Sequence, residues 1–503
     1  MKSNLIKTSF GVTFILCVGY AVSFIKESVL ANFFGAGAAI DAYTIALQIP
    51  VILFAFVAVA LRSIVIPVYT DIKHNVGVEE SKVYINALIS TLSIFALALI
   101  GLIFIFAKYV ILVFAPGFSP ETNFLAAQLL RIMCPTILCT IVSNICISVL
   151  NVHGKFIWPS IAVLFLNTTV ILSILFLHSH YGIFAAAVGQ LIGCCIELAY
   201  LLVLFNKHVQ FRFMFDLRNA HVRKSLKMSV PVIWSTSLAE VTAMINKIVA
   251  SFLFVGSIAV LSYASKINSM FISLFTSAIA TIIYPLYADS TAKNDMTGLN
   301  IRINKTLAAY VLFLMPLTAL ILCLKKEIIE IAFARGAFDA EAVERTQILL
   351  GWYSIGLIFM GFRESLTKVF YSLKDTKTPA INASIGFILN IVLNVSLPFV
   401  LGVQGLAIST SVTAIVISMG LLFRLLRRYS EIKVNLLKSN TWKILPCTLI
   451  AALFTIVVKH FSSDLNTWIY TFICCIAFGV VYILSLLCIR PGIWVELIKG
   501  LRK

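Results

Sequence analysis

The sequence predicts an all-α polytopic membrane protein with about fourteen transmembrane helices, built as two pseudo-symmetric six-helix bundles followed by two C-terminal helices. Three observations support this fold class. The 503 residues are 60% hydrophobic and only 12% charged, whereas soluble proteins are about 45–50% apolar and about 25% charged. Apolar runs of about 20 residues, the length that crosses a bilayer, follow one another along the chain. The two halves of the chain also share a repeated pattern.

The apolar runs give the position of each expected span. The first run ends at Lys26-Glu27 and lacks a cleavage site of small residues, so we expect a retained span rather than a signal peptide. The predicted spans are 5–30, 39–68, 84–112, 122–152, 158–178, 183–205, 226–253, 259–288, 303–324, 343–371, 378–400, 405–427, 442–459 and 466–489.

The distribution of Lys and Arg predicts the orientation of these spans. The termini and the even-numbered loops hold 26 of the 39 Lys and Arg residues, whereas the odd-numbered loops hold 6. Because cytoplasmic loops carry the excess of positive charge, both termini are expected in the cytoplasm. The same asymmetry accounts for most of the net charge of +18. That charge would face anionic lipid headgroups, and we expect no nucleic-acid partner.

An internal repeat predicts the domain organisation. The segment "IVIPVYTD" recurs as "IIYPLYAD", and Gly37 matches Gly256, at a separation of 218 to 219 residues. Further on, Gly182 matches Gly405 at a separation of 223. The repeat unit holds six spans, so both copies have the same orientation, as in transporters built from parallel repeats. We expect an N-terminal bundle at 1–224, a second bundle at 225–430, and two additional helices at 431–503.

Charged residues inside the spans are the candidate functional groups, because a charge at that depth costs at least about 2.5–3.5 kcal/mol. Spans 1, 2, 7 and 8 open the two repeats and are expected to line a groove between the bundles. Cations in a water-filled groove suit an anion such as phosphate. These spans carry Lys26, Glu27, Asp41, Arg62, Glu240, Lys247 and Lys266. On this reading Lys26 and Glu27 face water.

Pairing within the bundle is an alternative explanation for some of the charges in the spans. Lys247 is as readily explained by pairing with Glu240 as by substrate binding. In "RESLTK", Glu364 and Lys368 stand four residues apart, which favours an ion pair on one helix face. The eleven cysteines all lie in apolar runs without a CxxC motif, so we expect no metal or redox role and no cofactor held by them.

Several longer segments resemble those of the MurJ (MviN) lipid II flippases, which belong to the multidrug, oligosaccharidyl-lipid and polysaccharide exporter superfamily. The segments are "NFFGAGAAIDAY", "ASFLFVGSIAVLSYASK", "FARGAFDAEAVERT", "FYSLKDTKTPAINASIGFILNIVLN" and "GLAISTSVTA". The resemblance implies a transporter, not an enzyme, in the bacterial inner membrane. Its expected substrate is lipid II, an undecaprenyl-pyrophosphate-linked disaccharide-pentapeptide. The headgroup would cross through a cationic cavity from the inner to the outer leaflet, by alternating access.

The resemblance also implies roles for single residues. Lys26 stands where the family has an arginine, Glu27 is the following acid, Asp41 is kept in span 2, and Lys266 replaces an arginine in span 8. The arginine-rich segment of span 2 is replaced by "FAFVAVALRS", which leaves Arg62. Substrate binding is therefore expected at Lys26, Glu27, Asp41, Arg62 and Lys266.

Some members of the family bind sodium. The matching positions are Asn246, Asn390, Asn394 and Thr410, which are all neutral. Hard cations prefer carboxylate oxygens, so interhelical hydrogen bonding is the alternative role for these side chains. A sodium ion or the membrane potential is the expected energy source, membrane lipids are expected partners, and we expect a monomer.

Three other functions remain open from the sequence. A flippase for another polyprenyl-linked oligosaccharide would differ in its headgroup. A cation-coupled drug exporter would need carboxylates in a more apolar cavity. A membrane enzyme acting on polyprenyl-linked sugars would need catalytic groups on sizeable polar loops, whereas the polar loops of this chain are short and its seven histidines have no convergent acid.

Overall fold

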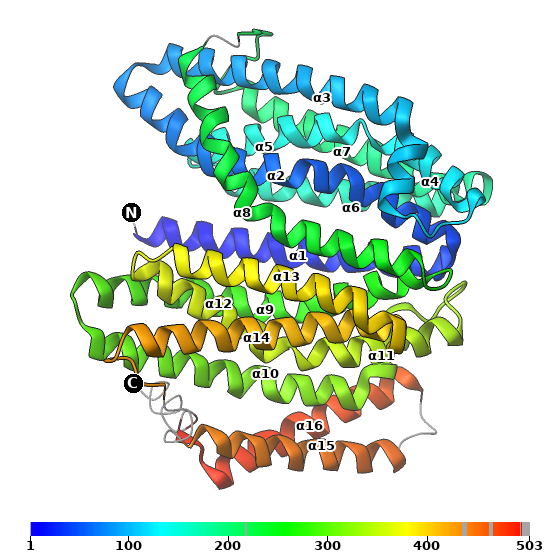
Figure 1. Cartoon of the computed structure of the whole chain (residues 1–503), viewed down its shortest axis with the longest axis vertical. Helices are drawn as coiled ribbons and strands as arrows, with labels where there is room; N and C mark the ends of the chain where they lie inside the picture. The colour runs from blue at the N-terminus through cyan, green and yellow to red at the C-terminus, as the bar shows by residue number, and fades with distance from the viewer. Residues whose placement is uncertain (1, 217–218, 435–439, 462–465, 493, 495–503) are drawn as a thin grey trace. The chain divides into compact units, whose positions relative to one another are not determined.

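The computed structural model of the chain describes residues 2–216, 219–434, 440–461, 466–492 and 494. Within these residues the regular structure is helical, with sixteen α-helices and one 3-10 helix, η1 (Thr441–Lys443) (Figure 1). The first eight α-helices are α1 (Lys2–Phe34), α2 (Ala38–Asn75), α3 (Val78–Phe114), α4 (Pro120–Met133), α5 (Thr136–Val152), α6 (Ile157–Tyr181), α7 (Phe184–Asn206) and α8 (Ala220–Ser251). The others are α9 (Ser257–Ala292), α10 (Met296–Phe333), α11 (Ala340–Ile355), α12 (Leu357–Ser372), α13 (Lys377–Leu401), α14 (Gln404–Arg428), α15 (Ile444–Phe461) and α16 (Thr467–Ile489).

The helices confirm the predicted all-α class. Each predicted span falls on one helix, except that the spans 122–152 and 343–371 each comprise two consecutive helices, α4 with α5 and α11 with α12. Ten helical segments in the described part of the chain are long and apolar enough to cross a membrane by length and composition. In α1, α2, α8 and α9, some side chains lie outside the described residues.

Each of the two breaks inside predicted spans has a specific cause, one local and one from another helix. Pro135 separates α4 from α5, because proline has no N–H to continue the helical hydrogen bonds. Between α11 and α12, the Ser411 hydroxyl of α14 donates to the Trp352 carbonyl at 2.7 Å. The Gly356 N–H bonds to the Tyr353 carbonyl instead of continuing the regular ladder. A side chain inserted into the ladder in this way is a known cause of a helix break.

The repeat predicted from the sequence is visible in the geometry of both halves. α3 and α10 each contain a non-helical residue, Phe106 and Leu324, 218 positions apart. α4 and α11 each begin with a side-chain cap, where Ser119 and Asp339 accept a hydrogen bond from the N–H three residues on. Shared kinks and caps at matching positions mark the two halves as structural copies.

One residue pairing within the repeat was wrong. The sequence paired Gly182 with Gly405, but the structure pairs Gly182 with Gly402. Both end their helix, α6 and α13, with a positive φ of 53° and 58°. Glycine favours that position because it lacks a Cβ. Gly405 instead packs closely on Leu397, where an added Cβ would lie 2.7 Å from the backbone carbon.

The chain divides into two compact units. Unit 1 comprises Met1–Ala259 and Gly336–Phe338, and unit 2 comprises Val260–Arg335 and Asp339–Lys503. In unit 1, α2 packs against α3, α4, α5 and α8, while α6 packs along α7 and α1 (Figure 1). α8 thus packs within unit 1 although the repeat assigns it to the second half. The domain boundaries at 224/225 and 430/431 stay a prediction.

Unit 2 is organised around α10. This helix packs against α11, α12, α15 and α16, and α14 packs against α11, α12 and α13. A buried core that includes Tyr287, Tyr310, Phe362 and Phe370 joins α9, α10 and α12. The two C-terminal helices are attached to α10 through smaller apolar clusters and through a Lys459–Glu327 ion pair of 2.8 Å.

Asp375, in the connection between α12 and α13, is a polar link with a testable effect. Its carboxylate accepts hydrogen bonds from the N–H and hydroxyl of Thr378 and pairs with Arg428 at 2.7 Å. Burial opposes the charged form, but the bonds from Thr378 and the charge of Arg428 outweigh it, so the pKa of Asp375 is lowered from 3.8.

A lowered carboxyl pKa stabilises the fold above pH 3.8, and this contribution is lost as the pH falls through the lowered value. We expect Asp375→Asn to reduce the free energy of unfolding by about 1–3 kcal/mol at pH 7 and by less near pH 3. Thermal unfolding in detergent at both pH values measures this difference. An equal loss at both would contradict an electrostatic origin.

Candidate functional site

Lys26 and Glu27 of α1 form a buried ion pair. The Lys26 Nζ lies 3.4 Å from a carboxylate oxygen of Glu27, and each residue is only 7% exposed. The expectation that this pair faces water differs from the structure, because mutual neutralisation lets both side chains be buried. Their role in binding substrate stays a prediction.

Asp41, in the first turn of α2, accepts hydrogen bonds from the backbone at the start of another helix. One carboxylate oxygen accepts the Gly256 N–H at 2.7 Å and the other accepts the Ala259 N–H at 2.8 Å. These groups form the N-terminus of α9, where unpaired N–H groups and the helix dipole favour a negative charge. Asp41 is 3% exposed, so in this conformation it acts as a helix cap.

The turn before α9 requires glycine at Gly256. Its φ is +94°, and an added Cβ would lie 2.0 Å from the Ala36 carbonyl oxygen in the turn between α1 and α2. The two turns therefore touch backbone to backbone, and Asp41 ties them together. The sequence pairs Gly37 with Gly256 as repeat partners. No local pattern predicts the contact between the two turns, because it joins residues more than two hundred positions apart.

Lys247 of α8 has a partner that the sequence did not suggest. Its ammonium donates to the side-chain carbonyl of Gln48 on α2, whereas the sequence offered Glu240 as a partner. Within unit 1, this hydrogen bond connects α2 to α8, and the Asp41 cap connects α2 to the residues that follow α8.

The remaining charges of the candidate site are distributed over α2, α9 and α12. Lys266 lies on α9 and is exposed. Arg62 lies in α2, but its side chain is outside the described residues. On α12, Lys368 pairs with Glu364 at 3.2 Å, which confirms the predicted ion pair of spacing four.

Three of the four sodium candidates lie on α13 and α14 of unit 2. Asn394 donates to the Asn390 side-chain oxygen, Asn390 donates to the Thr413 hydroxyl at 3.2 Å, and the Thr410 hydroxyl donates to the Leu406 carbonyl. Asn246 lies on α8 of unit 1. Among the described residues, no three His, Cys, Asp or Glu side chains form a metal-binding group. Among these bonds, that of Asn390 to Thr413 joins α13 to α14, and the neutral side chains fit hydrogen bonding within this helix pair better than sodium.

Comparisons with known proteins give the family. The sequence model described as "Lipid II flippase MurJ" matches residues 30–479. The probable lipid II flippase MurJ of Buchnera aphidicola subsp. Acyrthosiphon pisum (strain APS) is 29% identical over 478 residues, which cover 92% of each chain. The lipid II flippase MurJ of Thermosipho africanus (strain TCF52B) is 29% identical over 399 residues, 79% of this chain and 81% of that one.

Solved structures agree with this result. A lipid II flippase MurJ in an inward closed conformation has a TM-score of 0.83 and 26% identity, covering 95% of this chain and 98% of that one. An inward-facing multidrug resistance MATE family transporter shares the fold, with a TM-score of 0.68 and 15% identity over 84% of this chain and 98% of that one. With a matched segment of residues 30–479, the chain is a multi-pass membrane protein that belongs to the lipid II flippase MurJ family of transporters.

Proposed function

We propose that this protein carries lipid II from the inner to the outer leaflet of the bacterial inner membrane. The observation that carries the proposal is the family match over residues 30–479, which includes every candidate site residue except Lys26 and Glu27. The substrate crosses unchanged, so the protein supplies a path for a charged headgroup rather than covalent chemistry. We further propose that both termini are cytoplasmic, on the distribution of Lys and Arg, and that the protein acts as a monomer.

The cations of the candidate site are proposed to receive the pyrophosphate. A lysine ammonium binds phosphate as a point charge, and an arginine can bind it through two hydrogen bonds. Lys266 is exposed on α9, and an exposed cation at span depth is tolerated where it faces water rather than lipid. Lys26 and Arg62 are proposed as the further cations of the path.

Alternating access is proposed to depend on Asp41. Because Asp41 ties the turn between α1 and α2 to the N-terminus of α9, these turns stay together while the cap is formed. Opening at that end of the helices requires the two hydrogen bonds to break. Asp41 would therefore act in the gate, with Glu27 neutralising Lys26 until substrate arrives.

Lys266 allows a direct test of the proposed substrate path. In a bacterium depleted of its own lipid II flippase, the wild-type chain is expected to make lipid II accessible to an enzyme added outside the cells. Lys266→Ala is expected to reduce this accessibility by at least about tenfold, since a charged hydrogen bond to phosphate contributes about 1.5–3 kcal/mol. Lys266→Arg should retain transport.

Lys293→Ala is the matched control, because Lys293 lies in the turn directly after α9 and pairs with Asp289 near the end of that helix. Its transport should equal that of the wild type. If the inserted wild-type chain fails to expose lipid II, the headgroup is different. The replaced arginine segment of span 2 then favours a flippase for another polyprenyl-linked oligosaccharide, ahead of a cation-coupled drug exporter.

A further inference from the structure

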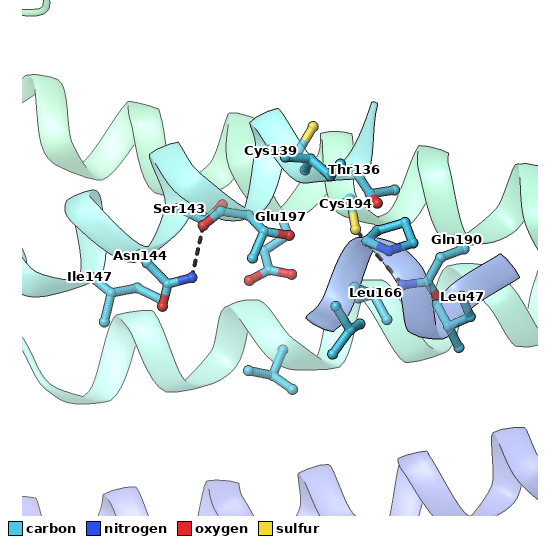
Figure 2. Close-up of a pocket in the computed structure, with 15 residues that line it drawn as sticks. Leu47, Thr136, Cys139, Ser143, Asn144, Ile147, Leu166, Gln190, Cys194 and Glu197 are labelled. Atoms are coloured by element: carbon cyan, nitrogen blue, oxygen red, sulfur yellow. Dashed lines mark hydrogen bonds between the residues drawn. The ribbon is translucent and has the colours of Figure 1, made fainter. Parts of the chain in front are cut away.

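A cavity with a mainly apolar wall and several polar side chains lies inside unit 1, apart from the residues discussed so far. It is lined by α2, α5, α6 and α7 and has a volume of about 270 Å³ (Figure 2). At about 30 Å³ for each water molecule, it can hold roughly nine. Fifteen described residues line it, and none of these is Lys, Arg or His. The cavity is therefore large enough for a hydrated ion and has no built-in positive charge.

The polar lining comes from two helix faces. On α7, Gln190, Cys194 and Glu197 follow one another at spacings of four and three, which places them on one face. On α5, Ser143 and Asn144 belong to a similar face that also carries Thr136 and Thr140. Figure 2 shows the Glu197 carboxylate directed into the space beside Asn144.

The depth of Glu197 makes this carboxylate unusual. It stands 13 residues after the start of α7 (Phe184–Asn206), which corresponds to about 20 Å along the helix axis. Asn144 lies 8 residues before the end of α5 (Thr136–Val152). Carboxylates at span depth are costly and mark ion or substrate sites unless they are structural.

Gln190 supplies an independent sign of a ligand. Its side chain is 8% exposed, lines the cavity, and has a carbonyl oxygen without a hydrogen-bond partner among the described residues. Its amide nitrogen makes only a long contact of 3.9 Å to the Cys194 sulfur. A buried unpaired carbonyl costs about 1–3 kcal/mol, and a cation or its bound water would remove that cost.

We propose that this cavity binds a small monovalent cation, with the Glu197 carboxylate as the charged ligand. The Gln190 carbonyl and the hydroxyl and amide oxygens of Ser143 and Asn144 contact the ion directly or through its water. One carboxylate among neutral oxygens matches a single positive charge, whereas calcium sites use several carboxylates. The site lies wholly within unit 1, so it is separate from Asn390, Asn394 and Thr410 of unit 2, and the inference stands whichever headgroup is transported.

Thermal unfolding of the purified full chain tests the proposal. NaCl and KCl are titrated separately against choline chloride at constant ionic strength and constant pH. Since an ion that binds the folded state raises the Tm with concentration, we expect one of the two salts to raise it in the wild type. Glu197→Gln should require at least about tenfold more of that salt for the same rise, because it removes the only charged ligand.

Two control variants locate the response. Glu364→Gln removes another carboxylate within a span, and Asn390→Ala alters the candidate site of unit 2; both should keep the wild-type salt response. If Glu197→Gln does not fold, Gln190→Met, which keeps the length but removes the carbonyl, should also weaken the response. The proposal is overturned if neither salt raises the wild-type Tm, or if the Tm changes with pH but not with either salt. It is also overturned if the cavity variants that fold show the same Tm response to salt as the wild type.

Discussion

Replacing Lys26 alone should damage both stability and transport, whereas neutralising Lys26 and Glu27 together should restore stability only. The two side chains are buried and 3.4 Å apart, so Lys26→Met leaves the Glu27 carboxylate without its lysine. Breaking a buried pair from one side costs about 3–5 kcal/mol, while removing both charges is often neutral. Thermal unfolding should therefore show a large loss for the single variant and a small one for Lys26→Met with Glu27→Gln.

Lipid II exposure in a flippase-depleted bacterium gives the second readout. If Lys26 receives the pyrophosphate, the double variant remains inactive although it is stable. Transport at the wild-type rate by the double variant would contradict that role and leave the pair as a purely structural element. Lys368→Met with Glu364→Gln is the matched control, because that pair of 3.2 Å lies on α12 and is proposed to have no contact with substrate.

Asp41→Ala is the second change with a large expected effect. It removes both acceptors of the Gly256 and Ala259 N–H groups, which are 2.7 and 2.8 Å from the carboxylate oxygens. Buried donors left unpaired cost about 1–3 kcal/mol each, and the charge at the N-terminus of α9 is lost as well. We expect a lower Tm and loss of lipid II exposure.

Asp41→Asn separates the cap from the charge. The amide keeps one good acceptor, so its stability should lie between those of the wild type and Asp41→Ala. Asp71→Ala is the control on the same helix. Asp71 is exposed, and among the described residues its carboxylate accepts a hydrogen bond from Asn75 alone. If Asp41→Ala has the same Tm and the same lipid II exposure as Asp71→Ala, this cap does not hold the turns together.

Hydropathy was sufficient to locate the helices but not their ends or breaks. α10 was predicted as 303–324 and runs Met296–Phe333, because polar ends of a helix continue outside the apolar core without any hydrophobic signal. The break at Pro135 could have been read from the sequence. The break at Gly356 could not, because it depends on the Ser411 hydroxyl of another helix.

In the candidate site, too, the sequence identified individual residues but not the distant residues that they contact. Lys26, Glu27 and Asp41 stood out as charges within spans, but their partners did not. Asp41 caps a helix that begins 216 positions later, and no local pattern indicates such a contact. By contrast, the spacing of Gln190 and Glu197 on one face of α7 was readable. What could not be read was that α2, α5 and α6 leave a cavity in front of that face.

The matched non-helical residues in α3 and α10 affect how the protein fits lipids of different chain length. These helices have 37 and 38 residues, or about 56 and 57 Å, against a hydrocarbon core of about 30 Å. Beyond Phe106 and Leu324, a short terminal segment of each helix follows a new direction. A helix that changes direction in this way spans less of the bilayer normal than a straight helix of the same length, and such kinking is one way in which a long apolar helix fits a thinner bilayer. Acyl-chain length therefore becomes a variable to control when the protein is reconstituted.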